Sequence, residues 1–326
     1  MSKHLALLSV AVGAALMATA TPALAGDGTN LYPMLSQDTQ ILVVFDVADS
    51  RDSTLLQKGF QKLLDMQPDA KAKIAEIGID PMKDIDTLAF AGGGVKDFDD
   101  MDSSKSMVIV IEGRLPKDKL SKLPDSKKST YKGVDVFTKD DTEAAFVGDR
   151  LFFTKKGGMK AQIDLAQGKA KAKSIAGGSK AKALKAALAT TDTAADLWMV
   201  VLVPEKNKKD MGEAGLVANS VSGGMNFTAN LAIALRVDSN SEEGAKKAVE
   251  MIQGQLAQVT AGMGQIGLTK AAKSITVVQD KAAIKMGITM TEAEINSLFG
   301  MASMMAGGGG GAAPAPAPPP APKKTK

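Results

Sequence analysis

One uninterrupted apolar run constrains the fold more than any other feature of the sequence. It extends from Met107 to Ile111, with Ser106 before it and Glu112 and Gly113 after it. A strand with one face in water alternates apolar and polar residues, so a run without alternation predicts a strand that is buried on both faces. We therefore expect residues 106–113 to form a central strand of a sheet.

A second run of similar character lies at Asn230–Asp238. Each of the two runs is followed by a helix-forming stretch and then by a hairpin pattern. This order predicts an α+β fold of two related units, each an antiparallel-rich sheet covered by helices. We place the first unit at residues 26–167 and the second at residues 192–306. The prediction of an internal repeat depends on the order of the elements, because residue identity between the units is poor.

The first 25 residues have the pattern of a signal peptide. A basic start at Lys3 and His4 precedes the apolar stretch Leu5–Ala20, and a small-residue site at Ala23–Ala25 precedes Gly26. The apolar stretch is too short to span a membrane permanently and ends in an A-x-A cleavage pattern. We therefore expect residues 1–25 to be removed and the protein to be exported to the periplasm or the cell surface, without a transmembrane segment.

The mature chain has neither Cys nor His. The sequence contains no Cys, and its single His is His4, inside the predicted signal peptide. This composition excludes Ser-His-Asp and Cys-His nucleophiles, thiolate or imidazole metal sites, and disulfides. We assign no catalytic, cofactor-binding or metal-binding residues, although carboxylate pairs, Ser-Lys pairs and oxygen-ligand sites remain chemically open.

Charge and aromatic content give no sign of a nucleic-acid partner. Without Lys3, the 40 Lys and Arg fall to 39 against 36 Asp and Glu, a formal charge of +3. So small a surplus does not attract nucleic acid or an anionic membrane strongly. The chain also has only one Trp, two Tyr and ten Phe, which leaves few rings for stacking on bases.

Local patterns predict the remaining elements. Strands are expected at residues 40–47, 84–91, 133–138 and 196–204, hairpins at 143–155 and 274–290, and helices at 53–66, 70–77, 114–123, 158–167, 242–259 and 291 to about 305. Thr291 and Glu294 have the spacing of a capping box. Gly148 suits a hairpin turn that needs a positive φ.

A helix stop is predicted at Gly78, because Gly tolerates the left-handed C′ position and Pro81 blocks continuation. The stretch Gly78–Asp86 resembles a group of exported bacterial proteins of uncharacterised function. In those proteins a helix ends in a Gly-Ile/Phe-Asp-Pro turn, and an Asp-rich step leads into a strand and then into a second unit of the same kind. The resemblance implies a two-unit α+β protein, and it brings no activity and no site residues.

Two segments have compositions unlike the rest of the chain. Residues 168–191 are rich in Lys, Ala and Gly, which predicts a solvated helical connector broken at Gly177 and Gly178. Residues 307–326 run from a Gly tract through Ala-Pro repeats to a basic end, which predicts a flexible tail without a fold of its own.

Several motifs have both a functional and a simpler structural explanation. The acidic loop 97–102 could hold Ca²⁺, but it lacks the Gly and the distal Glu of an EF-hand; its carboxylates are Asp97, Asp99, Asp100 and Asp102. The segment Gly262–Gly267 matches a dinucleotide-binding pattern, but a predicted helix precedes it and a strand follows, which favours a turn. Ser179 and Lys182 have Ser-x-x-Lys spacing, but a solvated Lys stays protonated and cannot act as a base.

A group of methionines and a run of lysines are two further candidate binding sites. Met301, Met304 and Met305 could bind Cu(I), although Met also fills gaps in ordinary helix packing. A local positive run could touch an anionic envelope polymer or lipid headgroups, but no aromatic or Leu-rich face accompanies it, so a solvated segment is favoured. Its members are Lys169, Lys171, Lys173, Lys180, Lys182 and Lys185.

The sequence predicts a non-catalytic binding or structural protein of the bacterial cell envelope, with a protein or an envelope polymer as its partner. One alternative is a periplasmic carrier of an apolar ligand such as lipid, held between the sheet and its helices. A carrier needs a large apolar cavity, whereas a scaffold packs solid. A carboxylate-based hydrolase is a further alternative, and it would need two converging acids, one with a raised pKa.

Overall fold

The computed structural model describes residues 28–66, 71, 72, 74, 78–98, 106–120, 126–213 and 217–307. Its strands are β1 Thr39–Asp46, β2 Ile85–Gly93, β3 Ser106–Gly113, β4 Lys127–Tyr131, β5 Val134–Lys139, β6 Thr142–Val147, β7 Arg150–Lys155, β8 Leu197–Leu202, β9 Ala218–Phe227, β10 Asn230–Ser239, β11 Thr276–Asp280 and β12 Ala283–Thr291. Its helices are η1 Thr29–Leu31, α2 Val47–Ser50, α3 Thr54–Met66, α5 Pro81–Asp84, α6 Lys117–Leu120, α7 Met159–Ala166, η3 Lys171–Lys173, η4 Ser179–Ala181, α8 Lys182–Leu188, α9 Glu205–Glu213, α10 Glu242–Gln265, α11 Thr269–Ser274 and α12 Glu292–Gly307.

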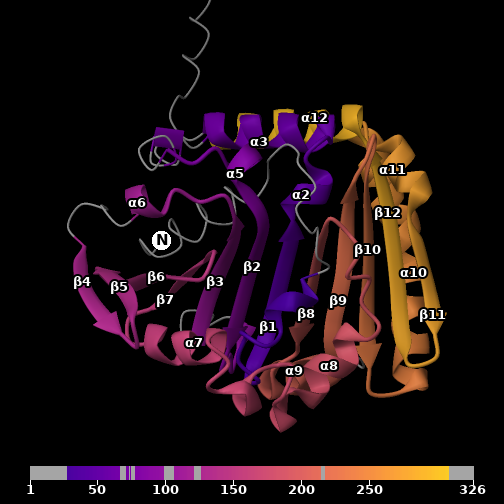
Figure 1. Cartoon of the computed structure of the whole chain (residues 1–326). Helices are drawn as coiled ribbons and strands as arrows, with labels where there is room; N and C mark the ends of the chain where they lie inside the picture. The colour runs from indigo at the N-terminus through magenta and orange to yellow at the C-terminus, as the bar shows by residue number, and fades with distance from the viewer. Residues whose placement is uncertain are drawn as a thin grey trace, which may run out of the picture.

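The strands form one continuous sheet of 12 strands in the order β11-β12-β10-β9-β8-β1-β2-β3-β7-β6-β5-β4, as Figure 1 shows. Strand β1 of the first predicted unit pairs antiparallel with β8 of the second, so both units contribute to the same sheet. The predicted α+β class with antiparallel strands is confirmed. The two units share one sheet instead of each having its own.

The apolar run that opened the sequence analysis is β3, which pairs with β2 and β7. Val108 and Val110 are buried on one face of the sheet, whereas Ile109 and Ile111 on the other face are only half-buried. The predicted interior strand is therefore confirmed. Burial on both faces is not, because helices cover the second face only in part.

The two faces of the sheet pack differently. Opposite residues of an antiparallel pair lie on the same face, so the register assigns every strand position to one of them. The first face carries Leu42, Val44 and Trp198, all fully buried in one core cluster that also includes residues of α7 and α8. The second face carries Phe45 and Leu88 under α3 and α5, and Ile284 under α10.

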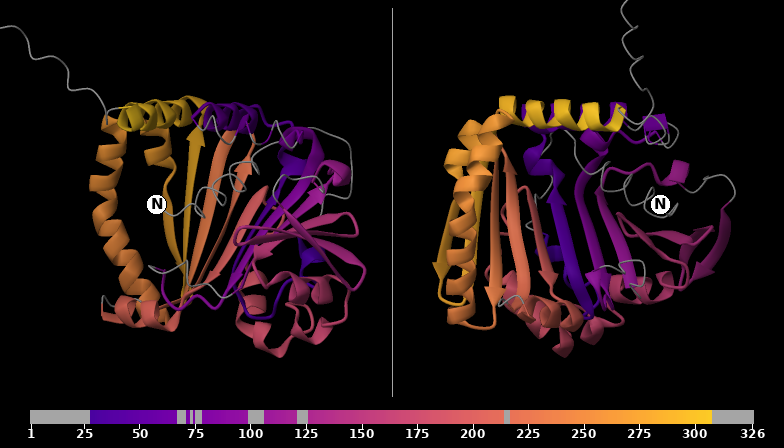
Figure 2. Two further views of the ribbon diagram at one scale, coloured as in Figure 1. Left: turned by 90° about the vertical axis from the view of Figure 1, so that its left-hand side faces the viewer. Right: turned by 180° about the vertical axis from the view of Figure 1, so that it is seen from behind.

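Helices α3, α5, α10 and α12 lie over the second face. Helices α3 and α12 lie side by side across one end of the sheet, and α10 runs along β11 and β12 (Figure 1, Figure 2). The Nζ atom of Lys62 in α3 lies 2.5 Å from Oδ1 of Asn296 in α12 and 5.4 Å from the ring centroid of Phe299. Helix α3 of the N-terminal part thus meets the last helix of the described chain.

The predicted capping box opens α12. The backbone N–H of Glu294 donates to Oγ1 of Thr291 at 3.4 Å, and the N–H of Thr291 donates back to Oε2 of Glu294 at 3.0 Å. The N–H of Ala271 donates to Oε1 of Glu294 at 2.8 Å, which ties α11 to α12. These N–H groups of Ala271 and Thr291 hold the pKa of Glu294 at about 2.

The prediction of a solvated connector at residues 168–191 is wrong. The apolar residues of this segment lie in the core of the first face, and Leu184 and Ile175 have no exposed surface. The sequence pattern was misleading because large apolar residues are few among the lysines, yet Ile175, Leu184 and Leu188, together with Ala181 and Ala187, are buried in the core. The helix predicted at residues 70–77 and the tail predicted at residues 307–326 lie largely outside the described residues.

Candidate functional site

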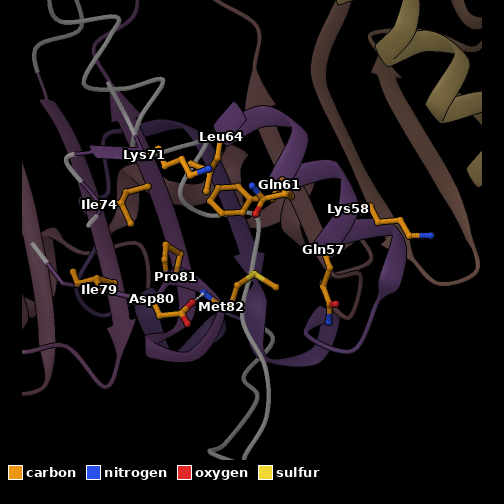
Figure 3. Close-up of a pocket in the computed structure, with 11 residues that line it drawn as sticks. Gln57, Lys58, Gln61, Leu64, Lys71, Ile74, Ile79, Asp80, Pro81 and Met82 are labelled. Carbon is orange, nitrogen blue, oxygen red and sulfur yellow. Dashed lines mark hydrogen bonds between the residues drawn. The ribbon is translucent and has the colours of Figure 1, made fainter. Parts of the chain in front are cut away.

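A groove of about 590 Å³ lies beside α3 (Figure 3). One wall is α3 itself, and the other is the chain from Ile79 to Met82, which leads into α5. The groove is lined by the apolar residues Phe60, Leu64, Ile74, Ile79, Pro81 and Met82 and by the polar residues Gln57, Lys58, Gln61, Lys71 and Asp80. Its volume lies within the range of small-molecule binding sites in proteins.

The apolar wall follows from the helical spacing of α3. Residues Leu56, Phe60 and Leu64 recur every four positions, so they lie on one face of the helix. Leu56 and Phe60 are buried, whereas Leu64, one turn further on, is half-buried. The apolar face of α3 is therefore longer than the part that packs on the sheet, and its far end, at Leu64, lines the groove.

The opposite wall is fixed by turn chemistry. Gly78 has a φ of 66°, the left-handed conformation that the sequence predicted. Asp80 then caps α5 by accepting a hydrogen bond from the N–H of Met82 at 2.9 Å, and Pro81 occupies the first turn, where a missing N–H costs nothing. Ile79 and Met82 are thereby held with their side chains against the apolar cluster of the second face.

Two lysine ammonium groups lie at the rim of the groove, and each forms an ion pair with an exposed carboxylate. Nζ of Lys58 lies 2.6 Å from Oε1 of Glu292, and Nζ of Lys71 lies 3.1 Å from Oδ1 of Asp65. Both side chains of the Lys71 pair are 55% exposed. Because exposed ion pairs contribute at most about 1 kcal/mol, these ammonium groups can exchange their partners for an anionic group of a ligand.

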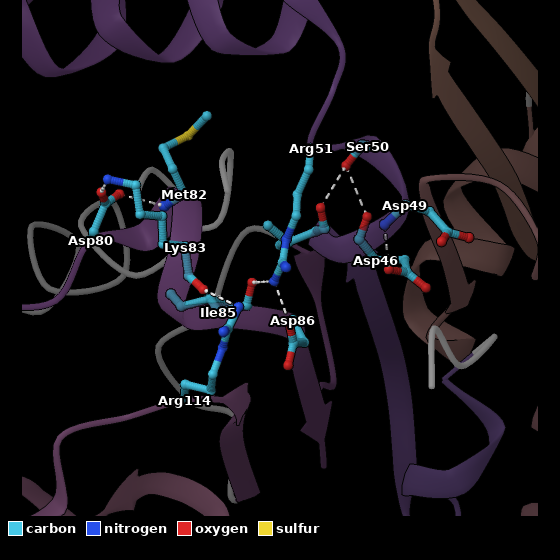
Figure 4. A network of polar contacts seen from close by, with 11 residues as sticks. Asp46, Asp49, Ser50, Arg51, Asp80, Met82, Lys83, Ile85, Asp86 and Arg114 are labelled. Atoms are coloured by element: carbon cyan, nitrogen blue, oxygen red, sulfur yellow. Dashed lines mark hydrogen bonds and ion pairs between the residues drawn. The ribbon is translucent and has the colours of Figure 1, made fainter. Parts of the chain in front are cut away.

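A buried arginine, Arg51, connects the elements next to the groove (Figure 4). The Arg51 side chain is 1% exposed, and its Nη2 atom donates to the carbonyl of Ile85 at 3.0 Å and also binds Asp86. The side chain of Gln57, a groove residue, donates to the carbonyl of Arg51 at 2.9 Å. Arg51 therefore joins the start of α3 to the end of α5. Among the described residues, no partner is found for its Nε and Nη1 atoms.

Two carboxylates near this network have raised pKa values. Burial raises the pKa of Asp46 to about 6, and the charges of Asp49 and Asp196 add to the shift. Burial also raises the pKa of Asp196. Asp46 accepts from the N–H of Asp49 at 3.1 Å and caps α2, and Asp196 accepts from the N–H of Phe227.

The hydrolase considered from the sequence requires two acids, one with a raised pKa, and the charge of Asp196 contributes to the raised pKa of Asp46. Neither residue lines the groove, however, and each caps a backbone N–H group. Their arrangement is accounted for by local structure. Within the described residues, no group of three or more acidic side chains is arranged to hold a metal ion.

The other motifs from the sequence lie elsewhere. Asp97 binds Lys206 and accepts a hydrogen bond from Nδ2 of Asn207 at 3.2 Å, which fastens its loop to α9. Asp99, Asp100 and Asp102 lie outside the described residues, so calcium binding by this loop stays a hypothesis. Met301 is half-buried in α12, and the side chains of Met304 and Met305 are likewise outside the described set.

The Gly-rich motif lies at the end of a helix, but the predicted turn into a strand is wrong, because Gly262–Gln265 belong to α10 and the next element is the helix α11. Gly267 has a φ of 82°, and the N–H of Leu268 donates to the carbonyl of Met263 at 2.9 Å, which stops α10 before α11. Ser179 and Lys182 lie at the start of η4 and α8 with exposed side chains.

No protein-family model matches the chain, and no curated protein matches its sequence. Among solved structures, crystal form III of TP0453 aligns with 82% of this chain and 97% of that chain, with a TM-score of 0.51 and 8% identity. The fold resembles that of TP0453. Crystal form I of the same protein aligns with 83% of this chain and 96% of that chain, with a TM-score of 0.47 and 7% identity. At these identities the likeness concerns the fold alone.

The turn at Gly78–Asp86, which supplies one wall of the groove, was named from the sequence, but no groove was predicted there. One signal was available, because the apolar face of α3 is followed, after the helix predicted at residues 70–77, by the helix stop at Gly78 and by the apolar Ile79. Whether such a face is covered or left open depends on contacts between residues that are far apart in the sequence.

No helix of the described residues is both long and apolar enough to cross a membrane.

Proposed function

We propose that the protein is an exported, non-catalytic binding protein of the bacterial cell envelope, and that it binds a single-chain amphiphile in the groove beside α3. The observation that carries this proposal is the groove itself, with six apolar lining residues below a rim of amide and ammonium groups. Such a lining suits an apolar chain, and the rim suits a polar or anionic head.

A second observation supports a binding role over a solid scaffold. On the second face of the sheet, beyond the cover of α3 and α5, large apolar side chains stay half-buried. They are Val43, Phe90, Met199, Val201, Ile233, Leu235, Ile288 and Met290. A scaffold that needs only rigidity has no use for apolar surface left open to water.

The rim favours an anionic head over a neutral one. Lys71 is exposed and lies at the groove with a weak partner, Asp65, whereas Asp80 is engaged by the N–H of Met82 and by Lys83 at 3.0 Å. An anionic head can therefore replace Asp65 without leaving a buried charge unpaired. A fatty acid anion combines this head with an unbranched apolar chain.

Calorimetric titration with laurate tests the proposal on the mature chain. We expect Ile79→Glu and Leu64→Glu to weaken laurate binding more than about tenfold, because each places a charge against the bound chain. Met251→Glu is the matched control, since Met251 is an apolar residue 50% exposed on α10, away from the groove. Lys71→Gln should weaken binding of laurate but not of dodecanol, which has the same chain and a neutral head.

Circular dichroism of each variant separates a lost site from a lost fold. Folded Ile79→Glu and Leu64→Glu variants that bind laurate like the parent would overturn the proposed site. A parent protein that binds no laurate, and whose native mass from the envelope equals that of its polypeptide, would instead indicate a structural protein.

A further inference from the structure

The segment that was expected to be a solvated connector presents a concentrated positive surface. Its six lysines have exposed side chains, and no acidic residue occurs between Leu165 and Thr191. We call this surface the lysine platform; it comprises Lys169, Lys171, Lys173, Lys180, Lys182 and Lys185. The platform lies beside α7 and α8, at the end of the sheet opposite to α3 and α12 (Figure 1).

The platform is held rigid by contacts on its inner side. Ser174 forms a β-bridge with Ser36, and the N–H of Gln37 donates to the carbonyl of Lys173 at 2.7 Å. The N–H of Lys180 donates to Oε1 of the same Gln37 at 3.3 Å. Both halves of the platform are therefore bound to Gln37, so the backbone that carries the lysines is held in place before any partner binds.

Compensating charge is scarce around the platform. Lys180 reaches Asp38 at 3.6 Å, and both side chains are more than half exposed. Lys169 donates to Gln167, and Lys185 donates to the carbonyl of Ala176. Asp164, the nearest acid before the segment, binds Lys132 at 2.6 Å, and the charge of Lys169 also contributes to its lowered pKa. Among the described residues, no acidic side chain lies within ion-pairing distance of Lys171, Lys173 or Lys182.

The chemistry of the platform selects the kind of partner. Its apolar residues point into the core, and the large apolar side chains that are exposed in the described chain lie on other elements, so the platform has no anchor for insertion into lipid. It also has no Arg, the residue whose planar fork recognises one phosphate or carboxylate with fixed geometry. Clustered ammonium groups instead suit a chain of repeated negative charges, which binds by releasing its counterions.

We propose that the lysine platform is a docking surface for an extended, phosphate-bearing polymer. The platform and the apolar groove lie at opposite ends of the sheet, so the two sites can be occupied independently. The protein would thereby be held at a polyanionic layer while its groove remains open.

Binding of long-chain polyphosphate to the mature protein tests the proposal. We expect the affinity to fall linearly with salt on logarithmic axes. The variant K171Q/K173Q/K182Q should bind at least about tenfold more weakly at low ionic strength, and its salt slope should be smaller by about 2, because three contacts are lost. The control K96Q/K270Q/K273Q removes the same charge from exposed positions on other elements and should behave like the parent.

Three results would overturn the proposal. Equal weakening by the two triple variants would show that only net charge matters. Absence of polyphosphate binding at low ionic strength would exclude the polymer. Binding to phosphatidylglycerol vesicles without binding to polyphosphate would assign the platform to a lipid surface. None of these results bears on laurate binding, which the K171Q/K173Q/K182Q variant should retain.

Discussion

Lys58 of α3 pairs with Glu292 of α12, with Nζ and Oε1 2.6 Å apart, although 234 positions separate the two residues. Lys62 and Asn296 have the same separation in sequence, so the two helices run parallel and in register. The pair joins the second helix after β1 to the last helix of the described chain. One wall of the groove is therefore supported by an element from the far end of the sequence.

We expect the Lys58–Glu292 contact to help set the register between α3 and α12 and to contribute little to the free energy of unfolding. A double-mutant cycle of Lys58→Ala and Glu292→Ala should give a coupling below about 1 kcal/mol at low salt, and the coupling should fall further in high salt, because both side chains are exposed. Urea denaturation at two salt concentrations measures it. A coupling that exceeds this bound and is insensitive to salt would contradict a solvated pair.

The burial of residues 168–191 predicts a large effect at Leu184. Leu184→Ala should lower the free energy of unfolding by about 2–5 kcal/mol, because it opens a cavity in the core of the first face. Lys185→Ala, at the neighbouring exposed position, should change stability by less than about 0.5 kcal/mol. Equal and small effects at both positions would restore the solvated connector that the sequence predicted.

The raised pKa of Asp46 predicts a specific dependence of stability on pH. Its pKa is about 6 in the folded protein against an ordinary value of 3.8, so the protonated form is favoured by folding. The resulting stabilisation is fully present below about pH 4 and is lost as the pH rises through about 6. Asp46→Asn keeps an oxygen acceptor for the N–H of Asp49 but carries no charge.

We therefore expect Asp46→Asn to match the parent near pH 4 and to exceed its stability by on the order of 2 kcal/mol at pH 7. Urea denaturation across this pH range measures the difference. Asp210→Asn removes an exposed carboxylate from α9 and is the control for the loss of one negative charge. A difference curve for Asp46→Asn that does not change with pH would show that Asp46 ionises in the folded protein as it does in the unfolded chain.

Glycines inside the covering helices offer a test of packing. A Cβ atom at Gly254 of α10 would meet no atom within 4 Å, so Gly254→Ala should raise the free energy of unfolding by about 1 kcal/mol through backbone entropy. Gly93→Ala in β2 should destabilise instead, because its Cβ would lie 2.4 Å from the carbonyl oxygen of Asp38. Loss of stability in Gly254→Ala would indicate that α10 packs more tightly than described.

The secondary structure was largely predictable, because local chemistry decides it. The capping box of Thr291 and Glu294, the left-handed Gly78 and the hairpin turn at Gly148 all form where the residues predict them. Strand β9 was missed for an equally physical reason. A Cβ atom added at Gly224 would lie 2.7 Å from the Cβ atom of Ala195, so the close packing here requires glycine. Strands are predicted from large β-branched and aromatic residues, and this segment has few of them.

The sequence by itself determined the α+β class, the antiparallel pairing, most element positions, the absence of Cys and the single His at position 4. Each of these depends on composition or on residues a few positions apart. Only the tertiary structure decided that both units share one sheet, that the Lys-rich segment covers a core, and that α3 meets α12 beside a groove. These features depend on which apolar faces remain uncovered after strands far apart in the sequence have paired. Patterns of neighbouring residues do not predict such long-range contacts.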